Sequence, residues 1–102
     1  MNPFLNHKDH AFRIVKETAR LSNQTYETLI GYNRKPPIFA ARAIAIYLIR
    51  NNTDLTLTEI GEIFKSRDHT TVKNAIKRAK EMISESKEIE AVCQEIDRKS
   101  VV

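Results

Sequence analysis

The chain has 102 residues, which is enough for one domain with a modest core but not for a deep substrate cavity as well. It is 41% hydrophobic and 29% charged, its net charge is +4, and it has only 2 Gly and 3 Pro, so it reads as a helical globular protein rather than a turn-rich β fold. The single Cys93 excludes an intramolecular disulfide and a thiolate metal cage, and no apolar run reaches the roughly 20 residues that span a bilayer.

The first predicted helix covers residues 8 to about 22. Phe12, Val15 and Ala19 give it a loose apolar stripe, with Ile14 at the edge of that stripe. The segment before it lacks the apolar region of a signal peptide. We therefore expect a cytoplasmic protein whose first helix packs its apolar stripe against the core.

A short helix follows, and Thr25 is placed to cap its start. Gly31 is expected to end this helix in the left-handed conformation that glycine often adopts at helix C-termini. The pair Pro36-Pro37 disfavours helix in the residues before it and lets a new helix begin just after. That next helix, residues 37–51, is apolar nearly all round, which is typical of a central buried helix.

The segment from residue 56 to residue 84 has the layout of a helix-turn-helix. Thr56 and Glu59 form a T-x-x-E capping box at the start of a helix of about nine residues, to which Phe64 adds an apolar side chain. A short polar turn and the N-cap Asp68 then precede a longer helix over about 68–84. The apolar residues of that helix recur at helical spacing: Val72, Ala75, Ile76, Ala79, Met82 and Ile83. A last helix over about 86–99 completes an all-α, single-domain fold of about six helices, in which Cys93 is a core residue.

The beginning of the longer helix suits the reading of bases in a DNA major groove. The Asp68 carboxylate can accept a hydrogen bond from a cytosine amino group, and the hydroxyls of Thr70 and Thr71 can bond to bases or phosphates. Residues 31–80 hold ten Lys/Arg against four Asp/Glu, so the positive charge that attracts DNA surrounds this motif. Simpler interpretations stay open, in which Asp68 is only an N-cap and His69 only a solvated side chain.

The adjacent pair Asp68-His69 also raises the question of acid–base chemistry. Neighbouring residues on a helix point about 100° apart, so the two side chains do not form a hydrogen-bonded dyad. The two glycines cannot build a phosphate-binding loop, and His7 and His10 lack a recognisable third metal ligand. We therefore expect no enzyme activity, no metal or other cofactor, and no small-molecule substrate.

The stretch LTEIGEIFKSRDHTTVKNAIKRAKE, residues 57–81, resembles the signature of the C-terminal DNA-binding domain of the bacterial replication initiator DnaA. The likeness extends back through AIAIYL to GYNRKPP and covers nearly the whole chain, so the chain looks like that domain standing alone, without the ATPase domain. The resemblance implies a Trp-repressor-like helix-turn-helix fold. It also implies monomeric, sequence-specific binding to duplex DNA at nine-base-pair DnaA boxes, in replication initiation or in transcription regulation.

Carried over residue by residue, the resemblance assigns roles to particular side chains. Asp68, His69 and Thr70 would read bases in the major groove, Thr71 would read a base or a phosphate, and Arg34 would enter the adjacent minor groove. The phosphates would be bound by the side chains of Arg67, Arg42, Arg50, Lys77 and Arg78 and by the main-chain amides of Leu57 and Thr58.

The sequence departs from the family pattern at two places. Lys65-Ser66 stands where the family usually has Gly-Gly, and Ala41-Arg42-Ala43 stands where it has Pro-Arg-Gln. The second change removes one polar contact. An alternative hypothesis is a helical protein–protein interaction module with a vestigial DNA-binding surface, for which the acidic residues 81–102, with three Lys/Arg against six Asp/Glu, would be the docking face.

Overall fold

The computed structural model describes residues 6–100, and this part of the chain forms six α-helices and no strand. The predicted all-α fold is therefore confirmed. None of the helices in this range is long and apolar enough to cross a membrane. In chain order the helices are α1 (His7–Leu21), α2 (Tyr26–Ile30), α3 (Pro36–Asn52), α4 (Leu57–Ile63), α5 (His69–Glu85) and α6 (Lys87–Ser100).

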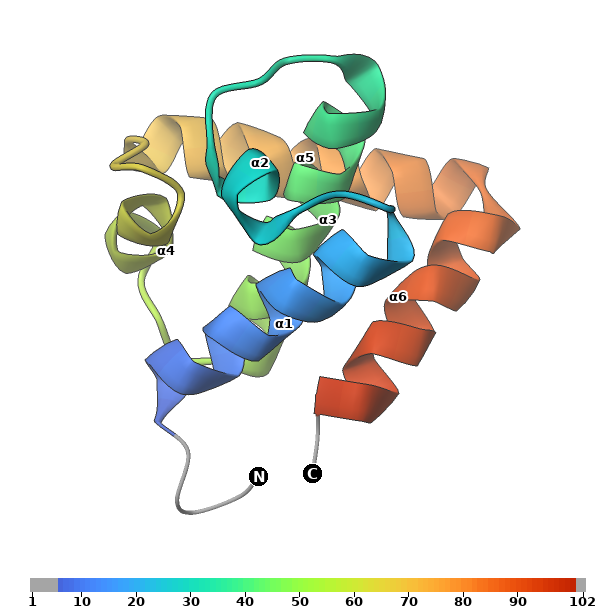
Figure 1. Cartoon of the computed structure of the whole chain (residues 1–102), viewed down its shortest axis with the longest axis horizontal. Coiled ribbons are helices and arrows are strands. Elements are labelled where there is room, and N and C mark those ends of the chain that lie inside the picture. Colours follow the sequence, from blue (N-terminus) through green and yellow to red (C-terminus); the bar gives the residue numbers. More distant parts are fainter. Residues whose placement is uncertain (1–5, 101–102) are drawn as a thin grey trace.

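Helix α3 is the centre of the fold and contacts each of the other five helices. In Figure 1, α1 and α2 cross in front of α3 and α5 lies behind it, while α4 and α6 stand at opposite sides. Ala45, Ile46, Leu48 and Ile49 of α3 are buried almost completely, because a helix enclosed on all sides has no face left for water. The prediction of a central buried helix is confirmed.

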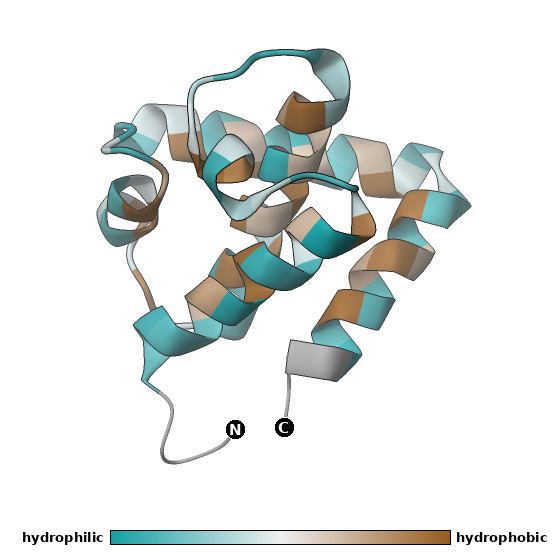
Figure 2. Ribbon diagram, viewed as in Figure 1, coloured by the Kyte–Doolittle hydropathy of each residue, from teal (hydrophilic) through white to brown (hydrophobic). Residues whose placement is uncertain are grey.

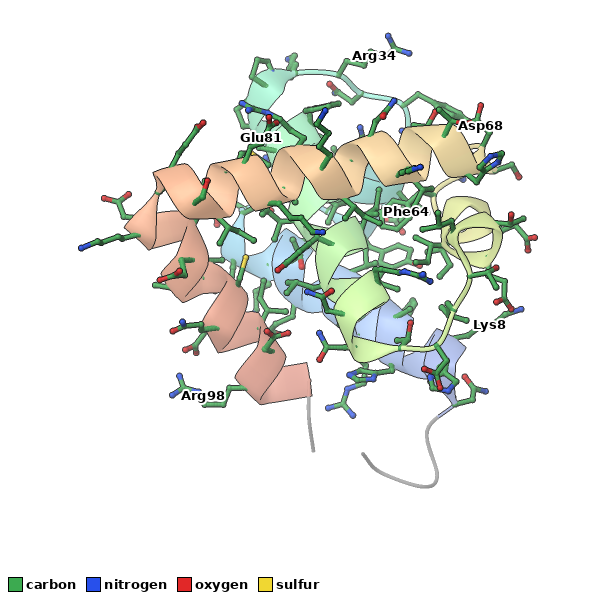
Figure 3. All side chains as sticks on the ribbon, turned by 180° about the vertical axis from the view of Figure 1, so that it is seen from behind. Lys8, Arg34, Phe64, Asp68, Glu81 and Arg98 are labelled. Atoms are coloured by element: carbon green, nitrogen blue, oxygen red, sulfur yellow. The ribbon has the colours of Figure 1, made fainter. Side chains whose placement is uncertain are left out.

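The apolar faces of the outer helices turn toward α3, as the brown segments in Figure 2 show. The largest fully buried side chain is Phe64, which lies directly after α4 and points toward α3 (Figure 3). Removing a side chain of this size from water stabilises a fold by about 2–3 kcal/mol. Phe64 therefore anchors the unit formed by α4 and α5 to the core.

The apolar stripe predicted for the first helix is wrong in one residue. Phe12 is 45% exposed, whereas Ile14, expected at the edge, is fully buried. The buried face of α1 includes Ala11 and Thr18, which a reading by large apolar residues passes over. Phe12 lies beside this face and packs on Tyr26, with 4.9 Å between the ring centroids.

Helices α5 and α6 are joined by the single residue Ser86. Its amide donates to the Met82 carbonyl at the end of α5, and its hydroxyl accepts from the amide of Ile89 in the first turn of α6. The core position predicted for Cys93 is confirmed, and burial raises the pKa of its thiol to about 11. The C-terminal helix therefore belongs to the same core as the rest of the described chain.

Candidate nucleic-acid interface

Helix α4 begins with the predicted capping box. The hydroxyl of Thr56 accepts from the amide of Glu59 at 3.1 Å, and the Glu59 carboxylate accepts from the amide of Thr56 at 2.9 Å. The bond that the Thr56 amide donates to the carboxylate, followed by the Thr56 side chain, holds the pKa of Glu59 below its ordinary value. The helix has seven residues rather than about nine, and Phe64, counted in its apolar face, is its C-cap.

The turn after α4 folds back tightly onto Gly61. The Gly61 carbonyl accepts from the amide of Phe64 at 3.1 Å and from the amide of Arg67 at 3.0 Å. A Cβ atom on Gly61 would lie only 2.0 Å from the Arg67 carbonyl oxygen. The backbones of helix and turn can approach this closely only because residue 61 has no side chain.

Two residues of this turn adopt a left-handed backbone conformation without being glycine. Lys65 has φ 63° and Ser66 has φ 61°. These are the positions at which the family that the sequence resembles usually has Gly-Gly. The turn therefore keeps a geometry that suits glycine and carries a conformational cost of about 1–2 kcal/mol for each non-glycine residue.

We expect Lys65→Gly to raise the free energy of unfolding by about 0.5–1 kcal/mol, because relief of the left-handed strain exceeds the added flexibility of the unfolded chain. Lys65→Ala is the matched control, since it removes the same charge but keeps the strain. Urea denaturation of the three proteins measures the difference. Equal stability of the glycine and alanine variants would contradict the strain.

The N-terminal end of α5 carries the predicted base-reading residues. Asp68 is the N-cap, and its carboxylate accepts from the amide of Thr71 at 2.8 Å, a bond that lowers the pKa of Asp68. His69, Thr70 and Thr71 follow in the first turn, and all four side chains are exposed. An ionised carboxylate has several acceptor sites, so Asp68 can cap the helix and still accept a hydrogen bond from a base.

Arg67 connects this turn to the loop after α2. Its guanidinium donates to the carbonyls of Ile30, at 3.1 Å, and of Gly31, and also to the Phe64 carbonyl within its own turn. Partial burial lowers the pKa of Arg67, partly offset by Tyr32. These bonds give Arg67 a structural role that the sequence did not reveal, while its phosphate contact stays a prediction.

Arg42 reaches the same region from α3 and is only 5% exposed. Its Nε donates to the Leu29 carbonyl at 2.7 Å and its Nη2 to the Thr28 carbonyl at 3.2 Å. Burial, with a smaller contribution from Arg67, lowers the pKa of Arg42 to about 10, so it stays charged at neutral pH. A phosphate contact by Arg42 also stays a prediction.

The two arginines together satisfy the C-terminal carbonyls of α2. The prediction of a left-handed Gly31 cap is wrong, because Gly31 has φ −81° and an extended backbone. The carbonyls left open at a helix end need donors, and cations are favourable there. Here Arg42 and Arg67 supply those donors to residues 28–31.

A surface hollow of about 430 Å³ lies between the loop after α2 and helices α3 and α5. It brings four of the predicted site residues together: Arg34, Arg42, Arg67 and Thr71. Tyr32 and Asn74 also line it. In Figure 3, Arg34 and Asp68 stand on the same upper side of the molecule, whereas Lys8 and Arg98 lie on the opposite side. The hollow thus separates the loop that carries Arg34 from the exposed end of α5.

The other predicted phosphate-binding residues lie outside this hollow. Arg50 is exposed and donates to the Leu55 carbonyl at 3.0 Å, between α3 and α4. Lys77 is exposed on α5, and Arg78 lies 3.7 Å from the carboxylate of Glu81. Leu57 and Thr58 are the first residues of α4, so their amides lie at its N-terminus.

Two polar residues that line the hollow, Tyr32 and Asn74, were not among the predicted site residues. Asn74 lies one helical turn after Thr70 and Thr71, so the i, i+3 and i+4 spacing could have placed it with them. Tyr32 carries no local signal, because its partners lie more than 30 residues away in the chain. Within the described part of the chain, no cluster of His, Cys, Asp and Glu could hold a metal ion.

This part of the surface combines exposed hydrogen-bonding groups at a helix N-terminus, nearby arginines and a basic loop. Proteins use such groups to contact the grooves and phosphates of DNA. Comparisons with known proteins agree with this arrangement. The family model described as "Bacterial dnaA protein helix-turn-helix" matches residues 12–79.

The chain is also similar to parts of several proteins named chromosomal replication initiator protein DnaA. The one from Corynebacterium jeikeium is 40% identical over 86 residues, which are 84% of this chain and 15% of that protein. The one from Leifsonia xyli is 41% identical over 76 residues, 74% of this chain and 16% of that protein. The one from Picosynechococcus is 32% identical over 97 residues, 94% of this chain and 22% of that protein. The chain spans less than a quarter of the length of these relatives.

Proposed function

Because the chain belongs to the family of bacterial DnaA helix-turn-helix domains, we propose that it binds duplex DNA sequence-specifically at DnaA-box-like sites. The observation that supports this most directly is the exposed first turn of α5, residues 68–71, beside the loop that carries Arg34. Binding to such sites would place the protein at the bacterial nucleoid, in the initiation of replication or in the regulation of transcription.

In this proposal, the N-terminal end of α5 enters the major groove. Asp68, His69 and Thr70 contact base edges, and Thr71, which lines the hollow, contacts a base or a phosphate. Arg34 reaches from its loop into the adjacent minor groove, where a cation meets the negative potential of A·T-rich sequence. In this arrangement α5 contacts the major groove and the Arg34 loop contacts the minor groove, and both elements border the same hollow.

The phosphates are bound by the basic residues around this reading end. Arg50, Lys77 and Arg78 are exposed and can approach the backbone directly. A guanidinium carries five N–H donors, so Arg42 and Arg67 can each serve the carbonyls of α2 and a phosphate in the hollow. The amides of Leu57 and Thr58 complete the contacts at the start of α4.

A fluorescence titration at moderate salt tests the proposal, with one duplex that contains a DnaA box and one in which the box is scrambled. We expect tighter binding to the box duplex and a steep loss of affinity with salt on both. Equal affinity for the two duplexes would contradict sequence specificity. No salt-dependent binding to either duplex would contradict DNA binding and favour a protein–protein interaction module.

Substitutions should separate base reading from phosphate binding. His69→Ala should weaken binding to the box duplex by about 1–3 kcal/mol and leave the scrambled duplex nearly unchanged. Arg50→Ala is the matched control, because it should weaken both duplexes alike and reduce the salt slope by about one. The same titrations at several salt concentrations measure both effects. A uniform loss with His69→Ala would contradict its role in base reading.

A further inference from the structure

We propose that Tyr32 is a positioning residue that, together with Arg67, ties the Arg34 loop to the turn of the helix-turn-helix and so fixes the distance between the minor-groove and major-groove elements. The inference rests on the proposed DNA binding. It assigns to the loop after α2 a device that sets the specificity of the site. We call the contacts that Tyr32 and Arg67 make between this loop and the turn after α4 the clasp.

The first part of the clasp is the side chain of Tyr32. Its hydroxyl donates to the Lys65 carbonyl at 2.6 Å. The guanidinium carbon of Arg67 lies 5.2 Å from the centroid of its ring, which is the geometry of a cation–π contact. The residue is 68% exposed, so these contacts, rather than burial in the core, hold it in place.

The second part of the clasp is the guanidinium of Arg67, which donates to the carbonyl of Ile30, the last residue of α2, and to that of Gly31, where the loop begins. The loop is thus bonded to the turn through the main chain on one side and through the Tyr32 side chain on the other. The acceptor of the Tyr32 bond is the left-handed residue Lys65. The clasp therefore also holds the turn where the family's two glycines are replaced.

Arg34 follows Tyr32 by two residues and lines the same hollow as Thr71. A protein that reads two neighbouring grooves loses affinity if one reading element must be ordered upon binding. Because the clasp joins the loop to the turn that precedes Asp68, it holds Arg34 and the end of α5 in place before DNA arrives. Tyr32 then affects specificity through Arg34 and not by touching a base.

A double-mutant cycle tests this mechanism with the box duplex. Tyr32→Phe removes the hydroxyl and keeps the ring, and we expect it to weaken box binding about threefold to tenfold. The scrambled duplex should be bound as before. In the Arg34→Ala background, Tyr32→Phe should have no further effect, because the group it positions is gone. An equal loss in both backgrounds would overturn the proposal.

A second measurement separates this mechanism from the proposed function. NMR order parameters of the free protein should fall for residues 32–34 in Tyr32→Phe and stay unchanged in α6. Unchanged order parameters in the loop would overturn the clasp even if DNA binding were confirmed. Conversely, if the wild-type protein does not prefer the box duplex, the proposed function fails while the loss of loop order still supports the clasp.

Discussion

Gly61→Ala should lower the free energy of unfolding by about 3 kcal/mol, the largest effect that we expect from a single methyl group in this chain. The added Cβ would lie 2.0 Å from the Arg67 carbonyl oxygen, and the atom that must move belongs to the backbone. Moving it breaks the bond from the Arg67 amide to the Gly61 carbonyl and shifts the start of α5. Thermal and urea denaturation measure the loss.

Gly31→Ala is the matched control for this substitution. Gly31 has φ −81°, which alanine also adopts, and its added Cβ would meet the Glu27 carbonyl at 3.0 Å, a much milder contact. We expect a loss below about 1 kcal/mol. A Gly61→Ala protein as stable as the Gly31→Ala protein would show that the turn relaxes easily and that Gly61 does not fix it.

Arg42→Ala should lower the free energy of unfolding by about 2–4 kcal/mol. The substitution removes a buried guanidinium that donates to the carbonyls of Leu29 and Thr28, and Leu29 is itself fully buried. The carbonyls of Thr28 and Leu29 then lose this charged donor, and the hollow loses one of its lining side chains. Chemical denaturation gives the size of the loss.

Arg50→Ala provides the comparison, since Arg50 also lies on α3 and is also expected to contact phosphate. It is exposed and donates to the Leu55 carbonyl, so we expect a loss below about 1 kcal/mol. Equal losses from the two substitutions would contradict the role of Arg42 at the end of α2.

The elements that could be predicted from the sequence are those fixed by local chemistry. The Thr56–Glu59 capping box and the Asp68 N-cap depend on residues three positions apart, and both are present as expected. The apolar stripe of α5 could also be predicted, because its pattern repeats over several helical turns. In the structure these residues pack in or against the core. Local rules of this kind define the helix-turn-helix.

Features that depend on tertiary contacts could not be predicted in the same way. The bonds of Arg42 and Arg67 to the end of α2 join residues 13 to 37 positions apart, and nothing in the sequence pairs them. The exposure of Phe12 likewise depends on how α1 is turned toward α3 and α6, since Ala11 and Thr18 occupy the buried face. From the sequence alone, an arginine in a basic segment is predicted to contact DNA whether or not it also stabilises the fold.

The departure at Lys65-Ser66 has a physical explanation in the fold. Both residues take left-handed backbone angles that glycine would adopt at lower cost. The turn tolerates these backbone angles because the hydrogen bond from the Arg67 amide to the Gly61 carbonyl fixes its ends and the Tyr32 hydroxyl donates to the Lys65 carbonyl. Loss of the two glycines is therefore compatible with an unchanged presentation of residues 68–71.

The most direct test of the DNA-binding face is an NMR titration of the isotope-labelled protein with a duplex that contains one DnaA box, at moderate salt. We expect the largest amide shift changes in residues 32–34 and 67–74, which include five residues that line the hollow, and small changes along α6. Shift changes centred on α6, or no changes at all in the first turn of α5, would contradict the assignment of this face to DNA.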